Sequence, residues 1–420
     1  AREMARQNFD IPLIIGGATT SPVHTAVMIE PVYYSPTVHV KDASQAVRIV
    51  SDLLSDERTG HFSQKVRVLH HKLRQQHAEK MESSQQLTIA QARDRSPRID
   101  WSEYQPKVPN KMGVTVLDNC SLGTIRSYID WTPFFKVWEL HGRYPAILEY
   151  RHIGPQAQEL LADANKLLKQ IIDNKLLNAR AVVGLFPANS IGDDIIIYAD
   201  SDRSTEASRS CFLRQQRDKP AGKNNYCLAD FVAPADSGIH DYLGMFAVSV
   251  GFGAGELAAR FESEQDDYRA IMTKALADRL AEALAEQIHE QARKSLWGYA
   301  ADEQLTHDSL ISEKYQGIRP APGYPACPDH TEKTVLFELL DVTHNTGIEL
   351  TDNLAMSPAA SVCGYYFSHC DARYFGLGRI SRDQVEDYAN RKHMSIEEVE
   401  QWLAPNLAYQ PSPVPCRQEG

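Results

Sequence analysis

The sequence predicts an α/β fragment of a doubly wound, Rossmann-like fold, followed by a larger α+β domain with a mainly antiparallel sheet and long helices. Two observations carry this prediction. Strand and helix signals alternate over residues 1–57, which is typical of a parallel sheet covered by helices. Residues 98–420 instead combine separate strand signals with one long amphipathic pattern, which is typical of α+β proteins.

The N-terminal segment is predicted to be the second half of an α/β unit. Ser21 and Pro22 are the N-cap and first-turn residues typical of a helix start. Two strands are too few for an independent parallel sheet, so we expect further strands upstream of residue 1. The predicted elements are a strand at 11–15, a tight turn at Gly16 and Gly17, a helix at 21–30, a strand at 37–40 and a helix that begins near residue 42.

Residues 58–97 are predicted to be a connector with a basic helical part and a polar end. We expect the adjacent His70 and His71 to lie in solvent. The basic residues either help to dock an acidic partner or form a solvated helix face. These residues are Lys65, Arg67, Lys72 and Arg74.

Residues 98–420 are predicted to form one domain. Its longest helix is expected from about 264 to 297, with a buried stripe of Ile271, Leu276, Leu280, Leu284 and Ile288. The other predicted elements are a hairpin of strands 182–186 and 195–198 linked by 187–193, a strand at 242–251, a strand pair at 365–368 and 374–380, and helices at 382–392 and 395–403.

The bulk composition is that of an ordinary globular protein. The chain has 420 residues, of which 43% are hydrophobic and 24% charged, and its net charge is −11. This charge argues against a general nucleic-acid surface. A membrane span needs about 18 or more apolar residues in a row, and the sequence has no such run. We therefore expect neither nucleic acid nor membrane as a partner.

The cysteines and the N-terminus point to a reducing, cytoplasmic setting. None of the 7 cysteines forms a CxxC pair, so a disulfide framework is not expected. Cys327 and His330 have a metal-like spacing but lack a second pair of ligands, so we predict no metal site. The chain begins without a secretory signal or an initiator Met, which suggests a fragment of a longer protein.

The segment from Arg319 to Pro325 packs three prolines and a glycine into seven positions. Proline fixes the backbone, and glycine permits a ligand to approach it closely. With Arg319 at one end and Tyr324 near the other, this stiff segment suits a ligand that carries a carboxylate and a planar ring. The alternative is a rigid loop with a structural role only.

Asp130 lies within the aromatic run 128–135. A buried carboxylate costs several kcal/mol unless it is paired, so this acid is a candidate to hold a ligand ammonium group. The alternative is an N-cap for a helix over 135–140, and the two roles are compatible.

At these segments the chain resembles the reactivation domain of cobalamin-dependent methionine synthases. The resemblance extends from residue 98 to about 409 and implies S-adenosylmethionine as the ligand. The segments that carry it are IDWTPFF (129–135), VGLFPAN (183–189), LADFVAP (228–234), KALADRLAEA (274–283), YQGIRPAPGYPACPDHTEK (315–333) and GYYFSH (364–369).

The resemblance also implies roles for individual residues. Arg319 would meet the methionyl carboxylate of S-adenosylmethionine, and Asp130 its ammonium group. No catalytic acid, base or nucleophile is expected, because the sulfonium is already an activated methyl donor. The other implied ligand-binding residues are Ala321, Gly323 and Tyr324 around the adenosine, Tyr374 and Phe375 along the pocket, and Glu282 and Glu313 as nearby acids. Glu282 is also explained as a solvated residue on an amphipathic helix.

Residues 1–57 resemble the end of the cobalamin-binding domain of the same family. Gly16, Gly17 and Ala43 would contact the nucleotide tail of cobalamin. The cobalt-ligating His and the modules for folate and zinc-bound homocysteine are missing from this sequence. We therefore expect the chain alone to bind cobalamin poorly and not to complete methionine synthesis.

The implied function is methyl transfer from S-adenosylmethionine to cobalamin during reductive reactivation, which restores the methylcobalamin of the full enzyme. The implied partners are a flavodoxin-type reductant and the upstream cobalamin, folate and homocysteine modules, and we expect a monomer. Two alternatives remain open from the residues alone: a non-catalytic S-adenosylmethionine sensor or partner-docking module, and a free-standing methyltransferase.

Overall fold

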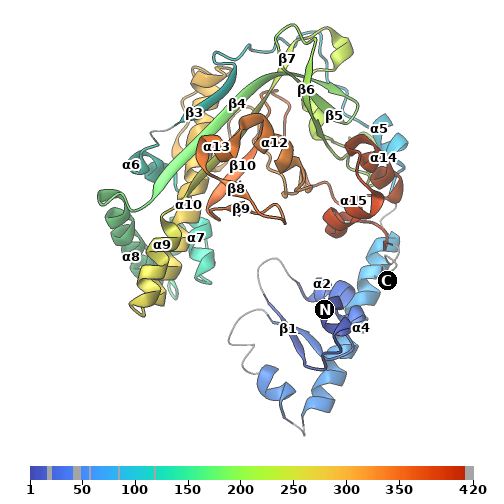
Figure 1. Ribbon diagram of the computed structural model, residues 1–420, viewed down its shortest axis with the longest axis vertical. Coiled ribbons are helices and arrows are strands. Elements are labelled where there is room, and N and C mark those ends of the chain that lie inside the picture. Colours follow the sequence, from blue (N-terminus) through green and yellow to red (C-terminus); the bar gives the residue numbers. More distant parts are fainter. Residues whose placement is uncertain (17–20, 41–48, 56–57, 84–85, 118–119, 412–420) are drawn as a thin grey trace. The chain divides into compact units, whose positions relative to one another are not determined.

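The computed structural model describes residues 1–16, 21–40, 49–55, 58–83, 86–117 and 120–411 (Figure 1). The chain divides into two compact units, Ala1–Gln86 and Leu87–Gly420. No described helix is both long and apolar enough to cross a membrane.

The smaller unit contains the predicted parallel strand pair. Strand β1 (Leu13–Ile15) pairs in parallel with β2 (Thr37–His39), and Ile14 lies opposite Val38. The other labelled elements are α1 (Arg2–Arg6), α2 (Pro22–His24) and α4 (Thr59–Ser83). Helix α2 starts as predicted, since the Ser21 side chain accepts a hydrogen bond from the His24 N–H at 3.1 Å. It continues as a π-helical turn, Thr25–Ile29.

Of the predicted cobalamin contacts, only Gly16 lies within the described residues; Gly17 and Ala43 lie outside them. A Cβ atom on Gly16 would stand 3.2 Å from Cγ2 of Val40, so the strand end is closely packed there. A side chain at this position would require Val40 to move.

Helix α4 belongs to this unit, and the position of His70 on it differs from the prediction. The ring of His70 is only 3% exposed, whereas we expected it in solvent. Burial lowers its pKa. Arg74 is not a free cation either, because it forms an ion pair with Glu30 and donates to the Ala26 carbonyl at 3.0 Å. The periodicity of α4 is too weak to reveal which polar side chains face inward.

The larger unit is built on an antiparallel sheet of six strands, as predicted. The strand order is β10-β7-β4-β5-β6, with β3 paired to β4 beside β5. The strands are β3 (Gly113–Leu117), β4 (Asn178–Ile191), β5 (Asp194–Tyr198), β6 (Glu206–Cys211), β7 (Asp241–Phe252) and β10 (Ser361–Tyr366). A small separate pair joins β8 (Glu349–Leu350) to β9 (Met356–Ser357).

Helices cover both faces of this sheet (Figure 1). Val183 and Leu185 of β4 join a core with the long helix α10 (Asp267–Gln291), while Val182 joins a second core with α12 (Glu332–Leu340) on the opposite face. Alternate strand residues point to opposite faces, so β4 is apolar on both sides. The other helices are α5 (Ile89–Asp94), α6 (Leu122–Ile125), α7 (Thr132–Val137), α8 (Gly154–Asp173), α9 (Ala254–Ser263), α11 (His307–Ile311), α13 (Val342–Thr346), α14 (Arg382–Lys392) and α15 (Ile396–Trp402).

Three predicted details differ from the structure. The link in the first hairpin is the short turn at Gly192 and Asp193, since β4 continues to Ile191. Residues 374–380 do not form a strand; only Ile380 makes an isolated bridge, to Leu407. Two glycines interrupt this stretch, Gly376 and Gly378, the second with φ +77°. Residues 87–97, which we expected in the connector, belong to the larger unit.

Ile271 is a further correction, because its side chain is 47% exposed whereas Leu276, Leu280, Leu284 and Ile288 are buried as predicted. Each helical residue turns by about 100°. Nine residues separate Ile271 from Leu280, so the two side chains point to opposite sides of α10. Residues that share one face of a helix are separated by steps of three or four residues. The step from 271 to 276 is five residues, so Ile271 leaves the buried face.

Candidate functional site

A cavity of about 420 Å³ lies between α10, β10 and two loops of the larger unit. Four stretches of sequence contribute to it: α10, residues 313–326, β10 and residues 374–375. The residues that line it are Glu282, Glu313, Arg319, Pro320, Ala321, Tyr324, Pro325, Ala326, Val362, Tyr374 and Phe375. The structure thus brings together seven of the nine predicted S-adenosylmethionine-binding residues, all except Asp130 and Gly323.

The proline-rich segment is held by its carbonyl groups, because its prolines have no N–H to donate. The Pro320 carbonyl accepts from the Tyr365 N–H of β10 at 2.9 Å. The Pro325 carbonyl accepts from the Leu377 N–H at 2.8 Å. These bonds fix the segment against β10 and against the loop that follows Phe375.

Gly323 does not line the cavity but permits the turn behind it. Its φ is +93°, and a Cβ atom there would stand 2.4 Å from Cε1 of the His330 ring. Its N–H donates to the Cys327 carbonyl at 2.7 Å. Glycine is required here both by the backbone conformation and by the close approach of His330.

Arg319 is the cation of the cavity. Its Nη2 donates to Oε2 of Glu286 at 3.0 Å, and Nη1 lies 4.0 Å from Oε2 of Glu282. Its backbone N–H donates to the Tyr374 hydroxyl at 3.0 Å, which ties the two loops together. Although burial opposes its charge, Glu286 raises the pKa of Arg319 above its ordinary value. The guanidinium therefore stays charged at any physiological pH.

The cavity also has an aromatic lining. Tyr324 is 56% and Tyr374 40% exposed, and Phe375 lies next to Tyr374. A partly buried guanidinium together with exposed aromatic rings fits a ligand with a carboxylate at one end and a planar group at the other.

Asp130 is not the N-cap residue that the sequence suggested as its alternative role, although it does bond to the start of the helix. Its Oδ1 accepts from the Thr132 N–H at 2.9 Å, at the first residue of α7. The N-cap position itself is Trp131, and the helix runs from Thr132 to Val137 rather than over 135–140. Its contact with a ligand ammonium group remains a prediction.

The comparisons with known proteins agree with this geometry. The profile of the family described as vitamin B12 dependent methionine synthase, activation domain, matches residues 121–393. The chain belongs to this family. Its larger unit is the activation domain, also called the reactivation domain, and the expected α+β fold is confirmed.

A solved structure extends the match. The crystal structure of the MetH reactivation domain bound to AdoHcy is 55% identical to this chain, with a TM-score of 0.76. The match covers 77% of this chain and 99% of that chain. Neither comparison tests the assignment of residues 1–57 to a cobalamin-binding domain.

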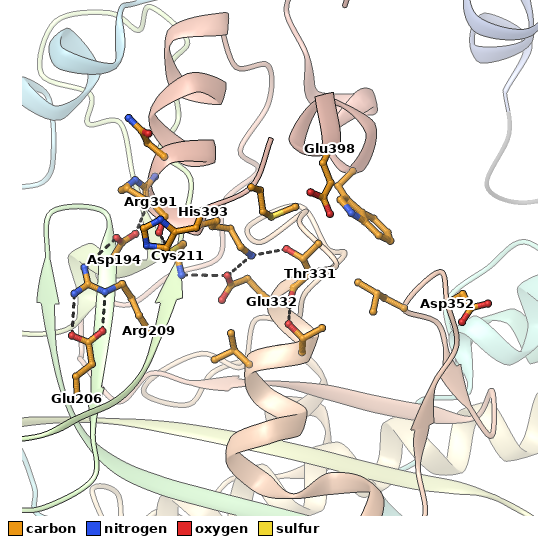
Figure 2. A pocket seen from close by; sticks show the side chains of 17 residues that line it. Asp194, Glu206, Arg209, Cys211, Thr331, Glu332, Asp352, Arg391, His393 and Glu398 are labelled. Carbon is orange, nitrogen blue, oxygen red and sulfur yellow. Dashed lines mark hydrogen bonds and ion pairs between the residues drawn. The ribbon is translucent and has the colours of Figure 1, made fainter. Parts of the chain in front are cut away.

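The activation domain has a larger cavity, of about 860 Å³, beside α12, α14 and β6 (Figure 2). All of its lysine and arginine side chains pair with carboxylates, for example Lys392 with Glu332 at 2.7 Å, and Arg391 with Asp194. Charges that are already neutralised by each other leave little to attract a charged ligand. Size alone therefore does not mark the ligand site.

One group of neighbouring ligand atoms among the described residues has the geometry for a metal ion: His369, Cys370 and Asp371. The three are consecutive in one loop, and Nδ1 of His369 already accepts from the Asp371 N–H at 3.0 Å. The His369 ring also packs against Trp101 and Tyr104. We therefore assign no metal to this group.

Sequence reasoning missed the polar residues behind Arg319. Glu286, His289 and Arg293 are almost completely buried on α10 and its final turn. The sequence contained a signal, since these three residues interrupt the otherwise apolar face of the helix at spacings of three and four. A charged residue on a buried face is costly unless it is paired, so each one requires a partner.

Proposed function

We propose that this chain binds S-adenosylmethionine in the 420 Å³ cavity and presents its methyl group for transfer to cobalamin during reactivation of methionine synthase. The observation that carries the proposal is the convergence of four distant sequence stretches on Arg319. AdoHcy, the ligand of the related crystal structure, differs from S-adenosylmethionine only by the transferred methyl group and the charge that it brings.

In this proposal Arg319 binds the methionyl carboxylate, and Tyr374 and Phe375 contact the adenosine. The backbone of Ala321 and Tyr324 forms the floor, and Gly323 permits its bend. The carboxylates of Glu282 and Glu313 favour the positive charge of the ligand, and Asp130 takes its ammonium group. The chain's own contribution is positioning, because the sulfonium already activates the methyl group.

The smaller unit and the partners belong to the same proposal. Gly16, Gly17 and Ala43 would contact cobalamin together with upstream modules of the same enzyme. A flavodoxin-type reductant would dock on the basic residues of α4. Lys65, Arg67 and Lys72 are exposed and available for this contact, whereas Arg74 is engaged with Glu30.

The test is calorimetric titration of the chain with S-adenosylmethionine. We expect Arg319→Ala to weaken binding roughly 100-fold, since it removes a charge-assisted and partly desolvated contact. Arg260→Ala, at an exposed position on α9, serves as the matched control. Unchanged affinity in Arg319→Ala would overturn the site. Binding without methylation of added cob(I)alamin would favour the sensor alternative.

A further inference from the structure

A chain of alternating charges runs behind Arg319, away from the cavity. Glu286 accepts from Nη2 of Arg319 at 3.0 Å and does not itself line the cavity. Its other oxygen, Oε1, lies 3.8 Å from Nη1 of Arg293. Arg293 in turn makes a paired contact with Glu303, at 2.8 to 3.1 Å. The order Arg319, Glu286, Arg293, Glu303 alternates positive and negative charge.

The end of this row of charges that is farther from the cavity is rigid. Arg293 is completely buried, and its guanidinium lies 4.1 Å from the centre of the Tyr315 ring. His289, on the same side of α10, stacks on Tyr366 at 4.9 Å with an interplanar angle of 6°. Because burial lowers the pKa of His289, this ring adds no third positive charge beside the two arginines. Glu286 therefore projects from a packed support and cannot follow Arg319 if it moves.

Glu286 leaves most of the Arg319 guanidinium available. A guanidinium has five N–H donors in a fixed plane, and Glu286 accepts only one of them. Nη1 of Arg319 is not bonded to Glu286 and lies 4.0 Å from Oε2 of Glu282 at the cavity wall. A carboxylate in the cavity can thus bind Arg319 while Glu286 holds it from behind.

We propose that Glu286 is a positioning residue that presets Arg319 for the α-carboxylate of the ligand and so makes the cavity selective for amino-acid-bearing nucleosides. This inference rests on the proposed function and deepens it. Without Glu286, the buried Arg293 and the partly buried Arg319 would face each other with no carboxylate between them. Arg319 would then turn toward Glu282 at the cavity wall, and ligand binding would have to bring it back.

The test compares two ligands on Glu286→Gln, which keeps the shape of the side chain and removes its charge. We expect affinity for S-adenosylmethionine to fall about tenfold, the size of one charge-assisted contact. Affinity for decarboxylated S-adenosylmethionine, which has no carboxylate for Arg319 to hold, should stay within about twofold. A residue with only a structural role would reduce both affinities equally, and that result would overturn the proposal.

Two further variants make the test decisive. Glu262→Gln removes the partner of Lys274 on α10, an ion pair of 2.9 Å far from the cavity lining, and should leave both affinities unchanged. If Glu286→Gln does not fold, Arg319→Gln/Glu286→Gln removes both charges together. That double variant should bind S-adenosylmethionine no more weakly than Arg319→Gln alone, and an additive loss would contradict the proposal.

If the unaltered chain binds neither ligand, the proposed function itself fails. If it binds S-adenosylmethionine and Glu286→Gln binds it as tightly or more tightly, only the positioning role fails. The two failures are therefore distinguishable in one titration series.

Discussion

At the scale of single residues, Gly323 shows how a position outside the cavity controls its shape. A side chain there would have to adopt φ +93° and would place Cβ 2.4 Å from the His330 ring. We expect Gly323→Ala to destabilise the protein by roughly 2–3 kcal/mol, because the strained backbone and the clash add. S-adenosylmethionine affinity should fall as well, because the segment must shift. Denaturant unfolding and calorimetry measure the two effects.

The matched control is Gly255→Ala in the first turn of α9. A Cβ atom on Gly255 meets nothing within 4 Å, and its φ is not positive. Alanine should be neutral there or stabilise by up to about 1 kcal/mol, because it favours the helix. Equal stability losses at both positions would show that Gly323 has no special requirement.

A second residue, His289, should make the protein sensitive to acid. Burial, with Arg293 and Arg319 nearby, holds the pKa of His289 well below its ordinary value. Below about pH 6.5 the unfolded chain binds a proton at this ring and the folded protein does not, so stability falls as the pH falls. The loss from this one group should approach about 1.4 kcal/mol per pH unit.

His289→Phe keeps an aromatic ring on Tyr366 and removes the titration. The free energy of unfolding, measured by denaturant between pH 7 and pH 5, should then fall less steeply than in the unaltered protein. The same substitution at the exposed His141 is the matched control. A slope that is identical in the two variants would show that His289 does not titrate on unfolding.

The sequence revealed some of these residues and concealed others for physical reasons. Arg319 was predictable because the prolines and the glycine beside it signal a backbone that a ligand approaches. Glu286 was not, because Glu282 and Glu286 look alike in a helix of mixed composition. Only the structure shows that one carboxylate lines the cavity and the other supports Arg319 from behind.

At the scale of elements, helix α14 is fastened to the start of helix α12 by buried ion pairs. Lys392 lies 3.0 Å from Asp329 and 2.7 Å from Glu332, and all three side chains are at most 10% exposed. We expect Lys392→Met to destabilise the protein by about 3–5 kcal/mol, because two carboxylates remain buried without their cation. Denaturant unfolding at pH 7 measures this loss.

The comparison for this prediction is an exposed ion pair. Lys274→Met breaks the ion pair with Glu262. The Lys274 side chain is 61% exposed and that of Glu262 50%, so the substitution should change the free energy of unfolding by less than about 1 kcal/mol. If both lysines contribute equally, burial is not what gives the α14 network its strength.

The elements themselves were predictable where one local pattern determined them. Strand β7 and helices α10 and α14 appear close to their predicted positions, because an apolar run or a helical period suffices to indicate them. Residues 374–380 were wrongly predicted as a strand, since their aromatic and apolar residues serve the cavity and the core at Leu377 instead. A strand forms only where a partner strand is present, and that partner is not visible in a local pattern.

At the scale of the whole molecule, the structure divides after residue 86, inside the predicted connector 58–97. The prediction ended the connector at the second of two polar stretches, 83–86 and 93–97, yet Arg93 pairs with Asp193 and Asp387 of the larger unit at 2.8 Å. Leu87 also donates its N–H to the Gln216 carbonyl at 2.7 Å. The ion-pair partners of such a polar segment lie far away in the sequence. The segment therefore looks like a solvated linker when only its own residues are considered.

This boundary leads to a prediction for the isolated larger unit. Every residue that lines the 420 Å³ cavity, and every residue of the charge chain behind it, lies within Leu87–Gly420. The related reactivation domain, which this chain matches over 99% of its length, was crystallised with AdoHcy. A fragment that begins at Leu87 should therefore fold and bind S-adenosylmethionine with the affinity of the full chain, within about twofold. A fragment that begins at residue 98 loses Arg93, whose removal leaves Asp193 with Arg214 alone, and should unfold at lower denaturant concentration. Calorimetry and denaturant unfolding of the two fragments measure both effects.

Two outcomes would contradict this prediction. A fragment from Leu87 that folds but does not bind the ligand would show that the smaller unit contributes to the site. Equal stability of the two fragments would place the boundary at residue 98.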